Sequence, residues 1–206
     1  MSNIVIINTG NGNFLSVKRA VEKFNKNVKI SHDPKEIISA SKIILPGVGA
    51  FKDSVSFLKK NKIFEIIKEI SNQKPILGIC LGMQLLFENS NEFGFCDGLN
   101  LIQGNIKPLP NQKIDEFNYK IPNIGWYNLE NNSKNFKYFY EKKDDFYFIH
   151  SFYAKDVKDK NLLAFYKFGN IKVPAIVKQK KIIGCQFHPE KSREPGLNII
   201  KYFLES

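Results

Sequence analysis

The stretch that decides the fold is residues 74–87, which read KPILGICLGMQLLF. Its first part, up to Cys80, is a short apolar run of the kind that forms a buried strand, and Pro75 marks the beginning of that strand. The apolar residues continue over 82–87 in a pattern that predicts a helix. A strand that passes directly into a helix through Gly-Ile-Cys-Leu-Gly has the spacing of a nucleophile elbow.

Cys80 is the candidate nucleophile of this elbow. The flanking Gly78 and Gly82 lack the Cβ atoms that would clash where the chain doubles back. The start of a helix after Cys80 would lower the pKa of the thiol through the helix dipole and free N–H groups. The N–H of Leu81 could then face a developing oxyanion. The alternative is that Cys80 is only a small buried residue at a strand end.

From the start of the chain through this stretch, short apolar strands alternate with amphipathic helices. We expect strands at 4–7, 28–30, 42–45 and 76–80, and helices at 14–24, 34–40, 82–87 and in two segments after Phe51. Such alternation predicts βαβ units, a mainly parallel central sheet and helices on both faces, and therefore an α/β fold.

The second half of the chain has few helical patterns. We expect strands at 101–108, 124–129, 146–151, 162–168, 173–178 and 182–186, polar surface loops at 131–139 and 155–161, and a closing helix at 196–204. These strands predict an antiparallel extension of the parallel sheet.

A thiol nucleophile needs a base and a group that orients the base. His188 lies in the stretch Gln186-Phe187-His188-Pro189-Glu190, where a strand ends at a stiff turn. It is the candidate base, and Glu190 could reach the imidazole nitrogen that faces away from Cys80. The alternative is an ordinary capping turn. Of the other histidines, His32 fits a surface turn and His150 ends a predicted strand.

A second glycine loop, Pro46-Gly47-Val48-Gly49, also follows a predicted strand. It lacks the Gly-Lys-Ser/Thr ending of a Walker A motif, so it resembles a phosphate loop only weakly. In a parallel sheet this loop and the elbow share the carboxyl edge, where sites form. We interpret Gly47, Val48 and Gly49, together with Leu81, as donors for an oxyanion opposite Cys80.

Composition narrows the class of protein. The 206 residues are 43% hydrophobic and 25% charged, and no apolar run reaches the ~18–20 residues that cross a bilayer. Three cysteines without a CxxC pattern favour a reducing compartment and predict neither a disulfide framework nor a metal site. The start of the chain has no basic segment of the kind that opens a secretory signal, so we expect a cytoplasmic protein.

The net charge of +11 raises the possibility of a nucleic-acid partner. However, Arg19 and Arg193 are the only arginines among 31 basic residues, and the lysines are spread along the whole chain. Base recognition and bidentate phosphate contacts favour arginine. We therefore expect a solvated basic surface and no nucleic acid; an acidic partner or ligand is the alternative.

These residues together resemble the class I, triad-type glutamine amidotransferases. The elbow and the His-Pro-Glu turn mark the superfamily. The Pro-Gly-Val-Gly loop and the Pro122–Trp126 stretch narrow the resemblance to the glutaminase subunits of imidazole glycerol phosphate synthases. The resemblance covers nearly the whole chain. It implies a flavodoxin-like three-layer fold and a single amidotransferase type-1 domain over 1–206.

The resemblance also implies a reaction. Cys80 would attack the side-chain amide of L-glutamine and form a thioester, His188 would protonate the departing ammonia and then activate water, and Glu190 would orient His188. Other positions match those that hold glutamine in the family: Gln84, Glu92, His150, Ser151 and Phe152. No metal or organic cofactor is implied.

The ammonia would pass to a (β/α)8-barrel cyclase subunit that makes imidazole glycerol phosphate and an aminoimidazole carboxamide ribotide. Five positions match the interface with that partner: Asn13, Asn123, Trp126, Tyr147 and Lys191. The chain departs from the family in two places: Asn123 stands where histidine is usual, and Asn8-Thr9 stands where Asp-Tyr is usual. Both lie on the side that would face the partner, so they bear on the pathway and not on the chemistry.

Three other functions remain open from the sequence. The same glutaminase could feed ammonia to the amidation of a bacterial surface sugar. The chain could be a cysteine hydrolase or stress protein of similar fold, although the Gln84 and Glu92 positions speak against this. It could also be an inactive binding subunit, against which the intact Cys80, His188 and Glu190 speak.

Overall fold

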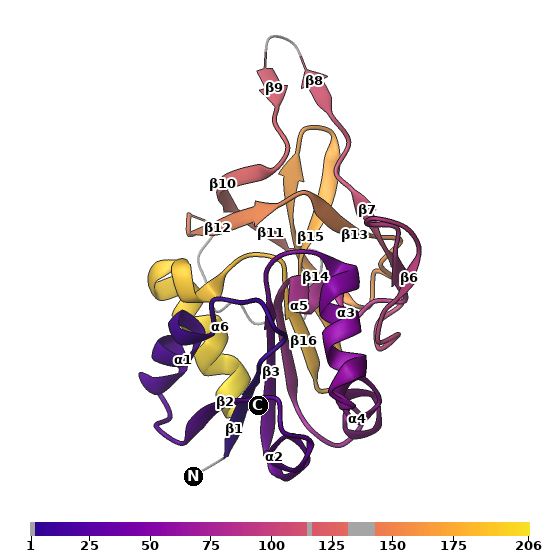
Figure 1. The fold of residues 1–206 in the computed structure, drawn as a ribbon. Helices are drawn as coiled ribbons and strands as arrows, with labels where there is room; N and C mark the ends of the chain where they lie inside the picture. The colour runs from indigo at the N-terminus through magenta and orange to yellow at the C-terminus, as the bar shows by residue number, and fades with distance from the viewer. Residues whose placement is uncertain (1–2, 115–116, 132–142) are drawn as a thin grey trace.

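The computed structural model describes residues 3–114, 117–131 and 143–206. One eight-stranded sheet runs through the molecule in the order β11-β14-β15-β16-β4-β3-β1-β2 (Figure 1). Its parallel part consists of five strands: β2 (Val28–Ser31), β1 (Ile4–Ile7), β3 (Lys42–Gly47), β4 (Ile76–Cys80) and β16 (Ile182–Cys185). All of them except the edge strand β2 are buried along their whole length.

The antiparallel part comes from the second half of the chain. It consists of β15 (Ile171–Gln179), β14 (Leu162–Phe168) and β11 (Glu130–Asn131). The prediction of a mainly parallel α/β sheet with an antiparallel extension is confirmed. The order β2-β1-β3-β4-β16 matches the doubly wound order of flavodoxin-like folds.

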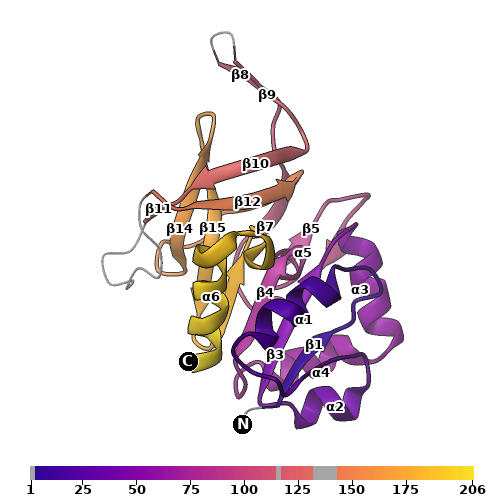
Figure 2. The same cartoon turned by 90° about the vertical axis from the view of Figure 1, so that its left-hand side faces the viewer.

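Helices cover both faces of the sheet because side chains alternate along each strand. Ile4 and Ile6 of β1 face α1 (Phe14–Glu22) and α6 (Arg193–Glu205), while Val5 and Ile7 face the opposite core. That second core receives α2 (Pro34–Ser39), α3 (Phe51–Lys60) and α4 (Ile63–Ile70). Figures 1 and 2 show the two groups of helices on opposite sides of the sheet.

Smaller sheets lie at the edge where the parallel strands end. One contains β13 (Phe152–Lys155), β7 (Asn105–Pro108), β5 (Asn89–Ser90) and β6 (Cys96–Asp97). Another pairs β10 (Asn123–Asn128) with β12 (Asp145–His150), and the hairpin of β8 (Gln112–Ile114) and β9 (Phe117–Tyr119) projects beyond it (Figure 2). These sheets stand over the carboxyl ends of β3, β4 and β16, so they enclose that edge.

Several predicted boundaries are wrong. The strand expected at 42–45 continues through Pro46 to Gly47. Its pairing with β1 stops at Ile44, so Pro46 has no neighbour on that side and the missing N–H costs no bond there.

The strand expected at 101–108 begins only at Asn105. The N–H groups of Leu99, Leu101 and Ile102 bond the carbonyls of Leu85 and Leu86, at the end of the short helix α5 (Leu81–Gln84). This segment therefore closes the elbow helix and pairs with no sheet. The helix α5 is itself shorter than the expected 82–87.

The closing helix begins at Arg193, earlier than the expected 196. Lys155, expected in a loop, ends β13, a strand that was not predicted from the sequence. The polar loop expected at 131–139 lies outside the described residues except for Asn131, and the loop assignment is wrong at that residue because Asn131 ends β11. None of the helices within the described residues has both the length and the apolar character needed to span a bilayer.

Candidate active site

Three loops that follow parallel strands converge at one edge of the sheet. β3, β4 and β16 are parallel neighbours, so their carboxyl ends lie side by side. In this register Gly47 is paired with Cys80, and β16 delivers the chain that leads to His188. The topology therefore brings together the glycine loop, the elbow and the His-Pro-Glu turn.

Cys80 has the strained backbone of an elbow, with φ 54° and ψ −110°. A Cβ on Gly82 would lie 1.6 Å from the carbonyl oxygen of Leu45, and one on Gly78 would lie 2.8 Å from the backbone of Gly82 and Met83. The two glycines are required for these close approaches. The surrounding β3 backbone and α5 hold the cysteine in this conformation.

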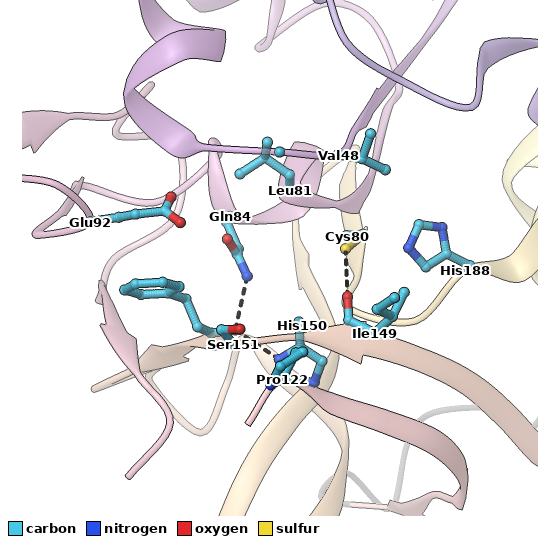
Figure 3. Close-up of a pocket in the computed structure, with 12 residues that line it drawn as sticks. Val48, Cys80, Leu81, Gln84, Glu92, Pro122, Ile149, His150, Ser151 and His188 are labelled. Atoms are coloured by element: carbon cyan, nitrogen blue, oxygen red, sulfur yellow. Dashed lines mark hydrogen bonds between the residues drawn. The ribbon is translucent and has the colours of Figure 1, made fainter. Parts of the chain in front are cut away.

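His188 stands next to the Cys80 sulfur, as Figure 3 shows. Its Nδ1 lies 2.9 Å from Oε1 of Glu190, and both side chains are almost completely buried. Within the described residues the other ring nitrogen, Nε2, has no hydrogen-bond partner. The side chains are thus ordered as nucleophile, base and orienting carboxylate.

The electrostatics of this pair favour a charged imidazole. Burial lowers the pKa of His188, but Cys80 and Glu190 raise it more, to about 10. The Cys80 sulfur and the Glu190 carboxylate both favour the imidazolium form of His188. The site can therefore hold a thiolate–imidazolium pair.

The turn that carries His188 is fixed by buried hydrogen bonds to β12. The hydroxyl of Ser192 donates to the carbonyl of His188 at 2.7 Å and accepts from the N–H of Tyr147 at 3.0 Å. The N–H of His188 donates to the carbonyl of Tyr147 at 2.9 Å. Ser192 was not singled out from the sequence, since a serine before a helix is most often a simple cap.

A cavity of about 270 Å³ opens at the Cys80 sulfur. Most of the predicted oxyanion and glutamine-binding residues line it: Val48, Gly49, Leu81, Gln84, Glu92, His150, Ser151 and Phe152. Gly47 lies behind the cavity in β3, and Glu190 lies behind His188. The volume suits an amino acid of the size of glutamine.

Glu92 provides a carboxylate at one end of this cavity (Figure 3). Its Oε2 accepts the N–H of Phe51 at 2.6 Å. Burial raises the pKa of Glu92, although the Phe51 N–H opposes the change. A carboxylate held in this way can bind the ammonium group of an amino acid.

His150 is a structural member of the cavity wall. Its Nδ1 donates to the carbonyl of Phe152 at 2.8 Å, so Nε2 accepts the hydroxyl of Tyr166 at 2.8 Å. Burial lowers the pKa of His150 to about 4, which keeps the ring neutral. A second base at this position is therefore not available near neutral pH.

The five expected interface residues lie in different environments. Trp126 is 40% exposed on β10 and Tyr147 packs against it on β12, while Lys191 lies over the Tyr147 ring. Asn13 directly precedes α1, a helix that contacts the turn Pro189–Lys191.

Asn123 differs from the other four because its side chain points inward and is 3% exposed. Its amide donates to the Tyr166 hydroxyl at 2.8 Å and accepts from the Tyr127 hydroxyl at 2.6 Å. Any effect of this side chain on a partner must therefore pass through the tyrosines, and the interface role of the five residues stays a prediction.

Comparisons with known proteins agree with this geometry. The profile of the family described as glutamine amidotransferase class-I matches residues 5–205. The chain is 41% identical over 212 residues to the imidazole glycerol phosphate synthase subunit HisH 1 of Legionella pneumophila (strain Paris), covering all of both chains. It is 43% identical to the subunit HisH of Lactococcus lactis subsp. lactis (strain IL1403), covering 100% of this chain and 99% of that one.

Solved structures share the fold at lower sequence identity. A crystal structure described as a glutamine amidotransferase superposes with a TM-score of 0.74 and 18% identity, covering 98% of this chain and 97% of that one. A glutamine amidotransferase from Thermotoga maritima gives a TM-score of 0.59 and 20% identity, covering 98% of this chain and 82% of that one.

Proposed function

Because the chain belongs to the class I glutamine amidotransferase family, we propose that it hydrolyses L-glutamine and supplies the ammonia to the cyclase subunit of an imidazole glycerol phosphate synthase. The observation that carries the chemistry is the ordered set of Cys80, His188 and Glu190 at the mouth of a glutamine-sized cavity. The full-length relatives named HisH support the choice of partner.

The reaction begins with transfer of the Cys80 thiol proton to Nε2 of His188. The thiolate attacks the side-chain amide carbon of glutamine, and the N–H groups of Val48, Gly49 and Leu81 stabilise the oxyanion. Gly47, which ends β3 behind the cavity, takes no direct part. The His188 imidazolium then gives its proton to the leaving nitrogen, which departs as ammonia. The product left on the enzyme is a γ-glutamyl thioester.

The second half of the reaction releases glutamate. Neutral His188 takes a proton from water, the hydroxide attacks the thioester, and the C–S bond breaks with its electron pair on sulfur. The proton on His188 returns to Cys80. Throughout both steps Glu190 holds Nδ1 of His188, while Gln84 and Glu92, with the His150–Phe152 segment, position the amino-acid end of the substrate.

The proposed cyclase partner needs a contact surface on this chain. We propose that Asn13, Trp126, Tyr147 and Lys191 contact the cyclase, that Asn123 acts behind them, and that residues 1–206 form one amidotransferase domain that works in the cytoplasm. The sugar-amidating alternative has no relative among those compared above to support it.

The test is release of glutamate from glutamine by this chain mixed with the cyclase subunit from the same genome, with and without the cyclase's nucleotide ligand. We expect strong activation by the liganded cyclase, and Cys80→Ala should abolish hydrolysis while the complex still makes product from added ammonium salts. If Cys80→Ala still hydrolyses glutamine, the nucleophile is misassigned. If the cyclase does not activate a chain whose Cys80 reacts with a glutamine-like electrophile, the ammonia acceptor is another protein.

A further inference from the structure

Gln186 lies in the site but was not among the residues predicted for it. It follows β16 directly, and its side chain is completely buried. Its Nε2 donates to the Cys80 sulfur at 3.7 Å. Gln186 and His188 lie two positions apart in the chain that follows β16, and both side chains approach the Cys80 sulfur.

The orientation of the Gln186 amide is fixed by a second buried amide. Nε2 of Gln84 donates to Oε1 of Gln186 at 3.1 Å and to the carbonyl of Phe152 at 2.9 Å. Both hydrogens of the Gln84 amide are thereby used, and the oxygen of Gln186 must face Gln84. The nitrogen of Gln186 is left facing the sulfur, and reversing it would leave buried polar atoms unsatisfied.

The sulfur also contacts a backbone carbonyl, and this contact has the opposite effect. The Cys80 thiol donates to the carbonyl of Ile149 at 3.8 Å (Figure 3). A carbonyl oxygen stabilises the protonated thiol and repels a thiolate, whereas an amide N–H stabilises the thiolate. The balance between the two forms of Cys80 therefore depends on a donor and an acceptor that are both held by the fold.

We propose that Gln186 stabilises the Cys80 thiolate directly through its side-chain N–H, and that Gln84 positions the amide for this role. The proposal rests on the function proposed above. The N–H acts twice: it favours the thiolate before attack on the amide, and it favours departure of the thiolate when the C–S bond of the thioester breaks and the electron pair returns to sulfur. It takes up no proton.

The experiment measures how alkylation of Cys80 by iodoacetamide depends on pH, followed at Cys80 by mass spectrometry. The wild type is compared with Gln186→Leu, which removes the donor, and with Gln186→Glu, which replaces it with an anion of the same shape. The titratable groups around the sulfur stay in all three: His188 and Glu190 after β16, Cys185 on β16, His150 on β12 and Glu92 across the cavity.

We expect the midpoint of alkylation to move to higher pH in both variants, and furthest in Gln186→Glu, by roughly 1–3 pH units. Glutaminase turnover in the complex should fall roughly tenfold to a hundredfold. The matched control is Gln73→Glu, which makes the same chemical change at an exposed glutamine. It should change neither the alkylation midpoint nor the turnover. Unchanged midpoints in folded Gln186 variants would overturn the proposal.

A second measurement applies if the variants do not fold. In wild-type protein labelled with ¹⁵N-glutamine, one side-chain amide pair should shift with ionisation of Cys80, and this titration should vanish in Cys80→Ala. If no amide pair responds, the proposal is overturned. Neither the alkylation midpoints nor the NMR titration needs glutamine or the cyclase, so a failure of these readouts is distinguishable from a failure of the proposed function, which would appear as missing activation with the alkylation results intact.

Discussion

At the scale of single residues, the most informative feature is the raised pKa of His188. The pKa lies near 10, above the ordinary value of 6.5, although burial alone would lower it. A raised pKa means that the native state binds this proton more tightly than the unfolded chain does. The contribution of His188 to stability is therefore complete below pH 6.5 and is lost as the pH rises through about 10.

Glu190→Gln tests this electrostatic arrangement. The amide keeps a hydrogen-bonding group next to Nδ1 but removes the negative charge, so the pKa of His188 should fall and the loss of stability should begin at a lower pH. Turnover should fall by about 10²–10⁴-fold, as expected when a base loses its orienting anion. An NMR titration of the histidines would measure the change in the pKa of His188. Urea unfolding between pH 6 and 10 would measure the change in the pH dependence of stability.

The control for this experiment is Glu205→Gln on the exposed last turn of α6, where the ion pair with Lys201 is 4.0 Å long. It should change neither the His188 titration nor turnover. A Glu190→Gln protein that retains the wild-type pKa of His188 would show that the carboxylate does not set it.

At the scale of elements, the elbow depends on backbone contact between β3 and α5. The closest approach is at Gly82, where an added Cβ would lie 1.6 Å from the Leu45 carbonyl oxygen. We expect Gly82→Ala to lower the free energy of unfolding by about 4 kcal/mol or more, because backbone on both sides prevents relaxation. Urea unfolding would measure the loss.

Gly94→Ala is the matched control. Gly94 has a φ of +98°, but no atom lies within 4 Å of an added Cβ. The substitution carries only the conformational penalty of a left-handed backbone, about 1–2 kcal/mol. If the free energy of unfolding fell equally in Gly82→Ala and Gly94→Ala, the contact between Gly82 and Leu45 would not be tight in solution.

At the scale of the whole molecule, the two halves of the chain share one sheet. β16, from the second half, pairs with β4 on one side and β15 on the other. Phe146 and Phe148 of β12 pack on Phe187 and Tyr166 in the same core, so the upper sheet that carries Trp126 is tied to the main one.

This topology predicts a single unfolding transition. Urea curves followed by fluorescence of Trp126, the only tryptophan, should coincide with those followed by far-ultraviolet circular dichroism. A control variant, Trp126→Phe, should retain the circular-dichroism transition while losing the fluorescence signal. An earlier fluorescence transition in the wild type would show that the β10–β12 sheet opens by itself.

Some properties follow from the sequence alone because they are local. The apolar strand, the two glycines and Cys80 determine an elbow wherever that stretch is buried, and the alternation around it determines a parallel α/β sheet. The His-Pro-Glu turn places Glu190 within reach of His188 because they are only two positions apart in the chain. Local geometry decides these features, so they could be predicted.

Other properties depend on tertiary structure because they join distant segments. The Gln84–Gln186–Cys80 contacts link residues more than a hundred positions apart, and the Ile149 carbonyl reaches the sulfur only because β12 lies over the edge of the sheet. The inward position of Asn123 follows from its pairing with Tyr166. Sequence specifies which groups can hydrogen-bond, and packing of the strands decides which of them meet.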